Sequence, residues 1–383
     1  MSGQGWNSGI RFLVVAVTLR GGGAERQVVH LLNELNRDQF EPYLYLFKEE
    51  GIYLDDLPED LPLISPRVEY KVELPRVLMH LRRTILSLEP DVAFSNMWPE
   101  TASLISVCRS LPAQKRPKVI VGIQNNPRFY GLWRIRTVQW LRSDIDRLVA
   151  CSSGVREALV NIHPSFRQAR VIPNSVDLHS IREQARQPLE HSWLDDSVPI
   201  LVAMGRLVEQ KGFHHLLPAI HLLQRRLPVR LWILGKGPLK QELEQQAREL
   251  GISGDVEFLG FQSNPFKYIA RSDVFVLSSL WEGLPSVLVE AMGLGLPVVA
   301  TRAPHGPEDV IEDGVTGYLV PVADPKAMAT SIEYVLSNPR ERDHVRHAGK
   351  SWVEQKFSAS YMSRQFESLF REVVDDQVRV RGS

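Results

Sequence analysis

The sequence alternates short apolar runs with segments of helical periodicity, and this rhythm is the strongest constraint on the fold. The apolar runs of the first half are IRFLVVAV (10–17), YLYLF (43–47), DVAFSN (91–96), VIVGIQ (119–124), RLVACSS (147–153) and RVIPNS (170–175). The segment from Ala24 to Asn36 carries apolar residues at helical spacing. Apolar strands that alternate with helices form parallel sheets with helices on both faces. We therefore predict an α/β fold.

The rhythm lapses in the polar stretch from Val176 to Pro199 and then restarts. The second set of runs is PILVAMG (199–205), VRLWILG (229–235), DVEFLG (255–260), DVFVLSS (273–279), PVVAT (297–301) and GYLVP (317–321). The chain has 383 residues, which is more than one ordinary core holds. We predict two doubly wound, Rossmann-like domains that face each other across a cleft, with Val176 to Pro199 as the passage between them. In such sheets ligands bind at the carboxyl ends of the strands.

Composition narrows the class of protein without naming a function. Hydrophobic residues make up 44% of the chain and charged residues 23%, as in soluble globular proteins. The formal net charge is zero, so nothing in the overall charge points to nucleic acid. The two cysteines, Cys108 and Cys151, are too few for a disulfide scaffold or a cysteine-rich zinc site. The N-terminal residues lack a signal-peptide pattern, and no apolar run reaches the roughly 18 residues of a spanning helix.

Three consecutive glycines, Gly21, Gly22 and Gly23, follow the first predicted strand and open a helix. Glycines let backbone N–H groups approach a ligand closely, and a helix N-terminus favours negative charge. The alternative is a plain tight turn. The segment is not a G-x-G-x-x-G fingerprint because position 26 is Arg, which weakens an NAD-binding interpretation.

A second motif, GRLVEQKGF (205–213), joins a buried strand to a helix that we expect to begin near Phe213. Arg206 and Lys211 flank this loop. Two fixed cations beside a helix N-terminus suit a diphosphate. The alternative is a pair of solvated surface cations.

The third motif, SSLWEGLPSVLVE (278–290), holds two glutamates eight positions apart. Pro285 suits the first position of a helix, so Glu282 precedes that helix and Glu290 lies inside it. Carboxylates bind vicinal hydroxyl groups well because they only accept hydrogen bonds. The spacing lets the two groups address different parts of one elongated ligand. Alternatively, Glu290 caps its own first turn or lies on the surface.

Together with GGGAER and GPEDVIEDGVTGYLVP, these motifs resemble the retaining glycosyltransferases of the GT-B fold, family four. The similarity covers nearly the whole chain and is strongest over residues 199–340. The sequence around GLPSVLVEAMGLGLPVVAT most resembles that of bacterial transferases that build lipopolysaccharide, capsule, teichoic acid or lipid-linked oligosaccharides. The resemblance implies an acceptor-binding domain (1–176), a domain for the nucleotide sugar (177–357), and a C-terminal helix (358–383) that packs back on the first domain.

The resemblance also implies roles for single residues. Glu290 would bind the ribose, and Glu282 the donor sugar with a part in catalysis. Arg206 and Lys211 would hold the diphosphate and stabilise it as it leaves. The remaining implied donor-binding residues are Gly22, Gly23, Lys236, Phe261, Gly283, Leu284 and Pro285. The expected donor is a nucleotide diphosphate sugar, most simply a UDP-sugar, and no metal or other cofactor is expected.

One position departs from the family pattern. The family often carries a histidine after the strand that VIVGIQNNP matches, whereas this chain has Gln124 there. A glutamine side chain can hydrogen-bond the donor sugar, but it cannot take up a proton at neutral pH. We therefore expect donor contact, and not base catalysis, from Gln124.

Two further segments suggest other ligands. Asp144 and Asp146 mimic the D-x-D of metal-dependent transferases, although we expect them only to end a helix. The segment RFYGLWRIRTVQWLR (128–142) mixes aromatic residues with arginines, which suits contact with anionic lipid or a partly buried helix equally well. We expect a cytoplasmic protein, with contact to the inner face of the membrane left open, and a glycan or lipid-linked acceptor.

Two other functions stay open at this point. A dinucleotide oxidoreductase would need a glycine fingerprint and a ribose-binding acid about 20 residues further on, and the first domain shows neither. A non-catalytic sugar-nucleotide or lipid-binding protein of the same fold is the other alternative. The complete set of Arg206, Lys211, Glu282 and Glu290 argues against it.

Overall fold

A computed structural model describes residues 9–66, 73–124, 139–304 and 306–381 of the chain. The chain divides into two compact units. Unit 1 comprises Met1–Ser175 together with Ala359–Ser383, and unit 2 is Val176–Ser358. The predicted boundaries place Val176 with the first domain and Ser358 with the last helix. Both belong to unit 2, because a parallel β-bridge joins them and the Val176 N–H donates to the Phe357 carbonyl at 2.9 Å.

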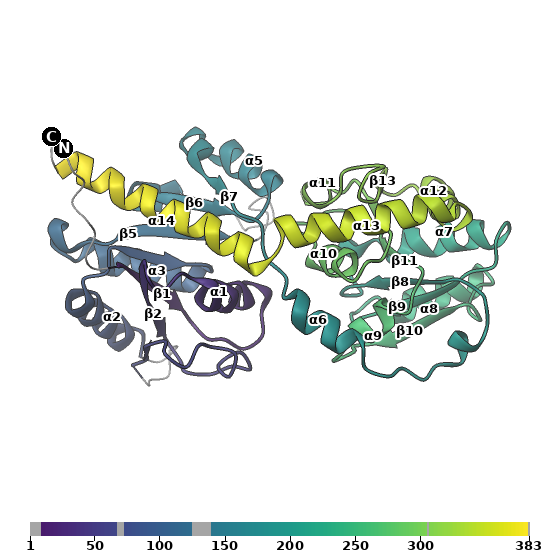
Figure 1. The fold of residues 1–383 in the computed structure, drawn as a ribbon, viewed down its shortest axis with the longest axis horizontal. Helices are drawn as coiled ribbons and strands as arrows, with labels where there is room; N and C mark the ends of the chain where they lie inside the picture. Colours follow the sequence, from purple (N-terminus) through teal and green to yellow (C-terminus); the bar gives the residue numbers. More distant parts are fainter. Residues whose placement is uncertain (1–8, 67–72, 125–138, 305, 382–383) are drawn as a thin grey trace. The chain divides into compact units, whose positions relative to one another are not determined.

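Unit 1 is built on a seven-stranded parallel sheet with the order β3-β2-β1-β4-β5-β6-β7. Figure 1 labels β1, β2, β5, β6 and β7 of this sheet. Its strands are β1 (Ile10–Ala16), β2 (Phe40–Leu46), β3 (Leu63–Ile64), β4 (Val92–Ser95), β5 (Lys118–Ile123), β6 (Arg147–Ala150) and β7 (Arg170–Val171). Its helices include α1 (Gly23–Glu34), α2 (Leu74–Leu88), α3 (Trp98–Arg109), α5 (Ser153–Ile162) and α14 (Ala359–Arg381). The six predicted strands are present. The sequence analysis missed β3, which has only two residues.

Unit 2 is built on a six-stranded parallel sheet with the order β10-β9-β8-β11-β12-β13. Its strands are β8 (Ile200–Met204), β9 (Arg230–Leu234), β10 (Val256–Gly260), β11 (Val274–Leu277), β12 (Val298–Thr301) and β13 (Tyr318–Val320). Its helices include α6 (Leu178–Ala185), α7 (Phe213–Gln224), α8 (Lys240–Glu249), α9 (Phe266–Ile269), α10 (Ser286–Gly293), α11 (Pro307–Val310), α12 (Pro325–Ser337) and α13 (Pro339–Lys356). All six strands lie where the sequence predicts them.

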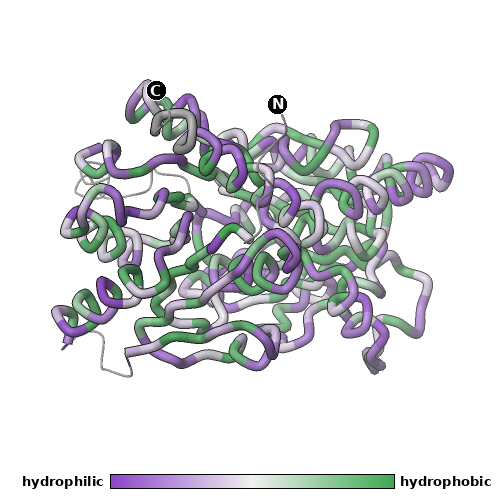
Figure 2. The backbone as a smooth tube through the Cα atoms, turned by 60° about the vertical axis from the view of Figure 1, so that its left-hand side comes forward, coloured by the Kyte–Doolittle hydropathy of each residue, from purple (hydrophilic) through white to green (hydrophobic). Residues whose placement is uncertain are grey.

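Helices cover both faces of the unit 2 sheet, as the continuous apolar strands require. On β8, Ile200 and Val202 join a core cluster with α6, α10 and α13, whereas Leu201 and Ala203 join a second cluster with α7, α8 and α12. Alternate residues of a strand point to opposite faces, so a strand buried on both sides reads as an unbroken apolar run. Figure 2 colours the backbone by hydropathy and shows green hydrophobic stretches alternating with purple hydrophilic ones.

The segment predicted as the passage between domains is part of unit 2. It contains α6, whose Ile181 and Ala185 are buried in the core cluster that includes Trp232. The prediction was wrong because a short helix with few buried residues has little apolar periodicity. The chain instead passes between the units at Ser175 and again after Ser358.

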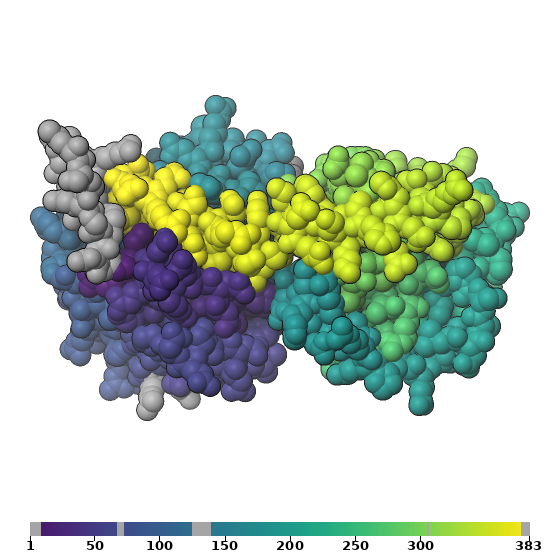
Figure 3. All heavy atoms as spheres, in the orientation of Figure 1, coloured from purple at the N-terminus to yellow at the C-terminus, as the bar shows by residue number. Residues whose placement is uncertain are grey.

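Helix α14 belongs to unit 1, although it follows unit 2 in the sequence. It packs against α1, and Phe366, Leu369, Phe370 and Val373 of its inner face are buried in the core of unit 1. The ring of Phe370 lies 4.2 Å, between centroids, from that of Phe12 on β1. Figure 3 shows α14 in yellow across the surface of unit 1.

Candidate active site

The predicted donor-binding residues of unit 2 gather at the carboxyl edge of its sheet. Arg206 follows β8, Lys236 follows β9, Phe261 follows β10 and Glu282 follows β11. Strands β8 and β11 are neighbours in the sheet although β9 and β10 lie between them in the sequence. They therefore flank the point where the strand order reverses, which is where open α/β sheets bind ligands.

Lys211 and Glu282 form a largely buried ion pair at this edge. The Lys211 ammonium lies 2.5 Å from Oε1 of Glu282, and the two side chains are 14% and 6% exposed. The Ser279 hydroxyl donates to the same carboxylate oxygen at 2.6 Å. The aliphatic part of Lys211 passes over Gly205, where a Cβ atom would come within 3.1 Å of it. One carboxylate oxygen is thus held from two sides, which fixes the orientation of Glu282.

The loops that follow β8 and β11 are bonded to each other. Ser278 donates its hydroxyl to the Lys211 carbonyl at 2.8 Å, and the Leu280 N–H donates to the Gln210 carbonyl at 2.8 Å. Gly212 has a φ of +61°, and a Cβ atom there would lie 2.2 Å from the Ser278 carbonyl oxygen. The two loops therefore form one rigid support for the ion pair.

Helix α10 carries the second glutamate. Pro285 is the N-cap of α10, and the helix begins at Ser286, one residue later than the sequence predicts. Glu290 lies about a turn inside the helix and is 7% exposed, so it is not a surface residue. Gly283 and Leu284 lie between the ion pair and α10, and both are partly exposed. The backbone of Pro285 carries no N–H group, so it offers a ligand only its carbonyl.

The loop after β12 adjoins Gly283. A Cβ atom at Gly306 would lie 2.2 Å from the Gly283 carbonyl oxygen, and the Glu282 N–H donates to the Pro304 carbonyl at 3.3 Å. Arg302 in this loop pairs with Glu308 of α11, which follows the loop, at 2.6 Å. His305 lies outside the described residues. The loop thus supports the backbone around Glu282.

Lys236 and Phe261 meet at the ends of β9 and β10. The Lys236 ammonium lies 5.4 Å from the centre of the Phe261 ring. Phe261 is 71% exposed. An exposed aromatic ring next to a cation is a surface on which a planar ligand can stack. Arg206 is exposed as well, which leaves its guanidinium accessible to a ligand.

The other predicted site residues belong to unit 1. The N–H groups of Gly21 and Gly22 both donate to the Glu25 carboxylate at 2.8 Å, so the protein itself occupies these two donors. A side chain at Gly23 would meet no atom within 4 Å. Gln124 lies at the carboxyl end of β5 and lines a pocket of about 230 Å³. Sequence reasoning missed Glu25 as the residue that binds the glycine loop.

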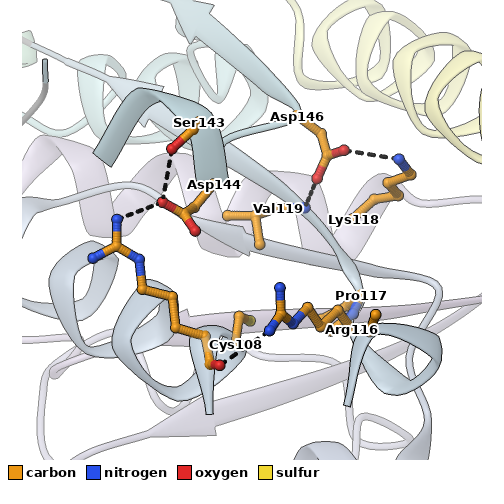
Figure 4. Close-up of a pocket in the computed structure, with 10 residues that line it drawn as sticks. Cys108, Arg116, Pro117, Lys118, Val119, Ser143, Asp144 and Asp146 are labelled. Carbon is orange, nitrogen blue, oxygen red and sulfur yellow. Dashed lines mark hydrogen bonds and ion pairs between the residues drawn. The ribbon is translucent and has the colours of Figure 1, made fainter. Parts of the chain in front are cut away.

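The D-x-D sequence is structural. Asp144 pairs with Arg109 at 2.6 Å, and Asp146 pairs with Lys118 at 2.8 Å while accepting the Val119 N–H (Figure 4). Arg109 also holds the pKa of Asp144 below its ordinary value. These groups surround a pocket at the amino ends of β5 and β6, which is the edge of the sheet opposite Gln124. Both carboxylates already have cationic partners.

The segment 128–142, for which lipid contact was considered, lies mostly outside the described residues. Trp140, in the described end of this segment, is 65% exposed. The centre of its ring lies 4.1 Å from the guanidinium carbon of Arg109. In the part of the chain that the structure describes, no helix combines the length and the apolar character that crossing a membrane requires.

Comparison with known proteins identifies the family. The family model described as Glycosyl transferases group 1 matches residues 189–352, and the model Glycosyltransferase Family 4 matches residues 21–180. The lipopolysaccharide core biosynthesis glycosyltransferase LpsE of Rhizobium meliloti is 30% identical over 342 residues, which cover 88% of this chain and 93% of that protein. The chain belongs to glycosyltransferase family 4.

This glycosyltransferase has other relatives of similar length. The N-acetylgalactosamine-N,N'-diacetylbacillosaminyl-diphospho-undecaprenol 4-alpha-N-acetylgalactosaminyltransferase of Campylobacter jejuni is 28% identical over 351 residues, 87% of this chain and 92% of that protein. The crystal structure of Anabaena HepE in complex with UDP and glucose has a TM-score of 0.76 at 20% identity, covering 95% of this chain and all (100%) of HepE. The predicted GT-B fold is thereby confirmed.

Proposed function

We propose that this glycosyltransferase moves a hexosyl or N-acetylhexosaminyl group from a UDP-sugar to a glycan or lipid-linked acceptor, with retention of configuration. The observation that carries the proposal is the Lys211–Glu282 pair on two bonded loops at the carboxyl edge of the unit 2 sheet. Support for the donor comes from HepE, which was crystallised with UDP. Support for the acceptor comes from the names of LpsE and of the Campylobacter enzyme.

The residues of unit 2 divide the donor between them. Arg206 and Lys211 bind the diphosphate and stabilise the charge that develops on it as the sugar departs. Glu282, whose free oxygen is kept in one orientation by Lys211 and Ser279, accepts hydrogen bonds from sugar hydroxyl groups. Glu290 accepts those of the ribose, and the base lies beside Lys236 and Phe261. Arg206 and Lys211 donate to the diphosphate in place of a metal ion, so the reaction needs no metal.

In the proposed reaction the acceptor hydroxyl oxygen attacks the anomeric carbon from the side that the diphosphate leaves. The bond between that carbon and the phosphate oxygen breaks, and the departing phosphate takes the acceptor proton. The protein stabilises the leaving group and supplies no nucleophile. Attack and departure on the same face retain the anomeric configuration.

Calorimetric titration with UDP, GDP, ADP and NAD, with and without EDTA, tests this proposal. We expect UDP to bind and its affinity to survive EDTA. Binding of GDP or ADP in place of UDP would change the donor but keep the chemistry. Binding of NAD alone, or of no nucleotide, would refute the proposal.

Assays of the intact chain with UDP-sugars and a panel of glycan and lipid-linked acceptors test transfer itself. NMR of the product's anomeric proton separates retention from inversion. Tight donor binding without transfer to any acceptor would instead favour a non-catalytic sugar-nucleotide-binding protein.

A further inference from the structure

The pocket of about 230 Å³ in unit 1 lies at the carboxyl ends of β4 and β5 and has two contrasting walls. The N-terminal residues of α3 and its cap, Met97, Trp98 and Pro99, form an apolar wall. The side-chain amides of Asn96 and Gln124 form a polar one. Among the described residues that line this pocket, none carries a charged side chain.

Three side-chain amides are bonded in a chain beside the pocket. Asn174 donates its Nδ2 to Oε1 of Gln124 at 2.7 Å, and Gln124 donates its Nε2 to Oδ1 of Asn96 at 2.6 Å. Asn96 in turn donates its Nδ2 to the backbone carbonyl of Ala24 at 2.9 Å. The chain links segments that lie 72, 28 and 50 residues apart.

The carbonyl of Ala24 fixes the direction of this whole chain. A carbonyl oxygen only accepts, so Asn96 must turn its NH₂ group toward Ala24 and its oxygen toward Gln124. Gln124 must then present its NH₂ group to Asn96 and its oxygen to Asn174. Turning over any one amide would bring two oxygens, or two NH₂ groups, face to face.

Gly122 on β5 leaves the space that Asn96 needs. A Cβ atom at this position would lie 2.1 Å from Oδ1 of Asn96. Asn96 is 5% exposed, so its amide has little room to move elsewhere. Packing and hydrogen bonding therefore both specify the position of the oxygen that receives the Gln124 N–H.

One hydrogen of the Gln124 NH₂ group remains after the bond to Asn96, and no acceptor for it occurs among the described residues. A pocket that combines apolar lining residues with a fixed N–H donor suits a sugar ring, because the ring has apolar C–H faces and hydroxyl oxygens at its edge. We propose that Asn96 and Asn174 are positioning residues that hold Gln124 in one orientation, so that it donates to a hydroxyl oxygen of a sugar in this pocket.

This inference rests on the proposed function, and the sugar belongs either to the donor or to the acceptor. The decisive variant is Asn174→Asp. At pH 8 its carboxylate would face Oε1 of Gln124, which forces Gln124 out of its orientation. We expect kcat/KM to fall at least about tenfold, since small misplacements of a binding group are costly. If KM rises for the donor alone or for the acceptor alone, that substrate carries the sugar that Gln124 contacts.

Three comparisons separate positioning from general damage. Once protonated, the carboxyl group introduced by Asn174→Asp can again donate to Gln124, so the ratio of variant to wild-type kcat/KM should rise as the pH is lowered toward 5. In a Gln124→Ala background, Asn174→Asp should have no further effect. Asn33→Asp is the matched control, because the Asn33 side-chain amide is also a hydrogen-bond donor, to the backbone carbonyls of Val29 and Asp56, but it does not line the pocket.

A readout that needs no activity completes the test. The side-chain ¹⁵N amide signal of Gln124, assigned by its loss in Gln124→Ala, should shift in Asn174→Asp and stay unchanged in Asn33→Asp. An unshifted signal, or an equal loss of kcat/KM in the Gln124→Ala background, would overturn the inference. If the wild-type chain bound no nucleotide and transferred no sugar, the proposed function would fail while the NMR result still decided whether the amide chain exists.

Discussion

At the scale of single residues, the Lys211–Glu282 pair carries the largest energetic constraint of the site. Removing charges from water costs several kcal/mol per ion, and mutual attraction together with further hydrogen bonds has to compensate for it. Here the compensation comes from the 2.5 Å contact and from the Ser279 hydroxyl. The pair is therefore a poor way to gain stability, but it holds a carboxylate ready for a ligand.

We expect Glu282→Ala to affect both stability and turnover. It leaves the Lys211 ammonium largely buried without its partner, which should cost about 3–5 kcal/mol of unfolding free energy. Turnover should fall about 100-fold with little change in UDP affinity. Calorimetric unfolding and initial rates measure the two effects. The control is Lys211→Met combined with Glu282→Ala, which should destabilise the chain less than the sum of the single changes.

Glu290→Ala should instead weaken binding of the nucleotide. If Glu290 holds the ribose hydroxyls, its loss should weaken UDP binding about 10-fold or more, because two charge-assisted hydrogen bonds disappear. Titration calorimetry with UDP measures this. Ser286→Ala, at the exposed start of the same helix, should leave the affinity unchanged. Wild-type UDP affinity in Glu290→Ala would mean that the ribose assignment is wrong.

The buried carboxyl group of Glu100 on α3 should make the unfolding free energy depend on pH. Burial raises the pKa of this carboxyl from 4.5 to about 7, and its Oε2 atom has no hydrogen-bond partner. Between these pH values the unfolded chain loses a proton that the folded chain keeps, so the Glu100 contribution to stability falls as the pH rises. Glu100→Gln removes this dependence.

The difference in unfolding free energy between Glu100→Gln and the wild type should therefore grow in favour of the variant from pH 5 to pH 8, by up to about 3 kcal/mol. Urea unfolding at several pH values measures it. A difference that stays constant over this range would show that Glu100 ionises normally.

At the scale of elements, the turn at Gly212 decides how the two site loops meet. The residue combines a φ of +61° with a close approach to the Ser278 carbonyl. Gly251 has a similar φ of +72°, but a side chain there would meet no atom within 4 Å. The two glycines thus separate backbone strain from steric contact.

We expect Gly251→Ala to cost about 1–2 kcal/mol, the strain of a left-handed alanine. Gly212→Ala should cost clearly more and should also lower turnover, because the β8 and β11 loops are forced apart. Thermal unfolding of the two variants, with initial rates for each, provides the comparison. Equal destabilisation of the two variants would show that the β8 and β11 loops move apart at no measurable cost in free energy.

The sequence predicted elements better than it predicted contacts. Strands such as β1 and β8 were found because strands buried on both faces are apolar throughout. The two residues of the ion pair were singled out from separate motifs, but their pairing was not predicted, because 71 residues separate Lys211 from Glu282. Asn96 and Asn174 were missed because an asparagine after a strand is typical of any turn.

At the scale of the whole molecule, the chain closes unit 1 with its last helix. Met362, Phe366, Leu369 and Phe370 of α14 belong to the same core cluster as Phe12, Val14 and Phe40 of the first strands. The helix is therefore a part of that core, and unit 1 consists of two pieces of sequence that are separated by all of unit 2.

Phe370→Ala should consequently destabilise unit 1 and spare unit 2. The side chain is fully buried (0% exposed), so its truncation should cost about 3–5 kcal/mol. Hydrogen exchange should speed up in β1 and β2 and remain unchanged in β8 and β11. Arg364→Ala, on the exposed side of α14, is the control. Equal acceleration in both sheets would mean that the units do not unfold separately.

Because α14 follows unit 2 in the sequence, unit 2 is completely translated before unit 1. Unit 2 has its complete sequence as soon as Ser358 has been translated, whereas the nascent first 175 residues still lack the helix that covers their apolar face. That face stays uncovered until α14 (Ala359–Arg381) has been translated. A premature stop codon just after position 358 would therefore remove α14 and leave unit 1 without a complete core, although all of Met1–Ser175 would have been made.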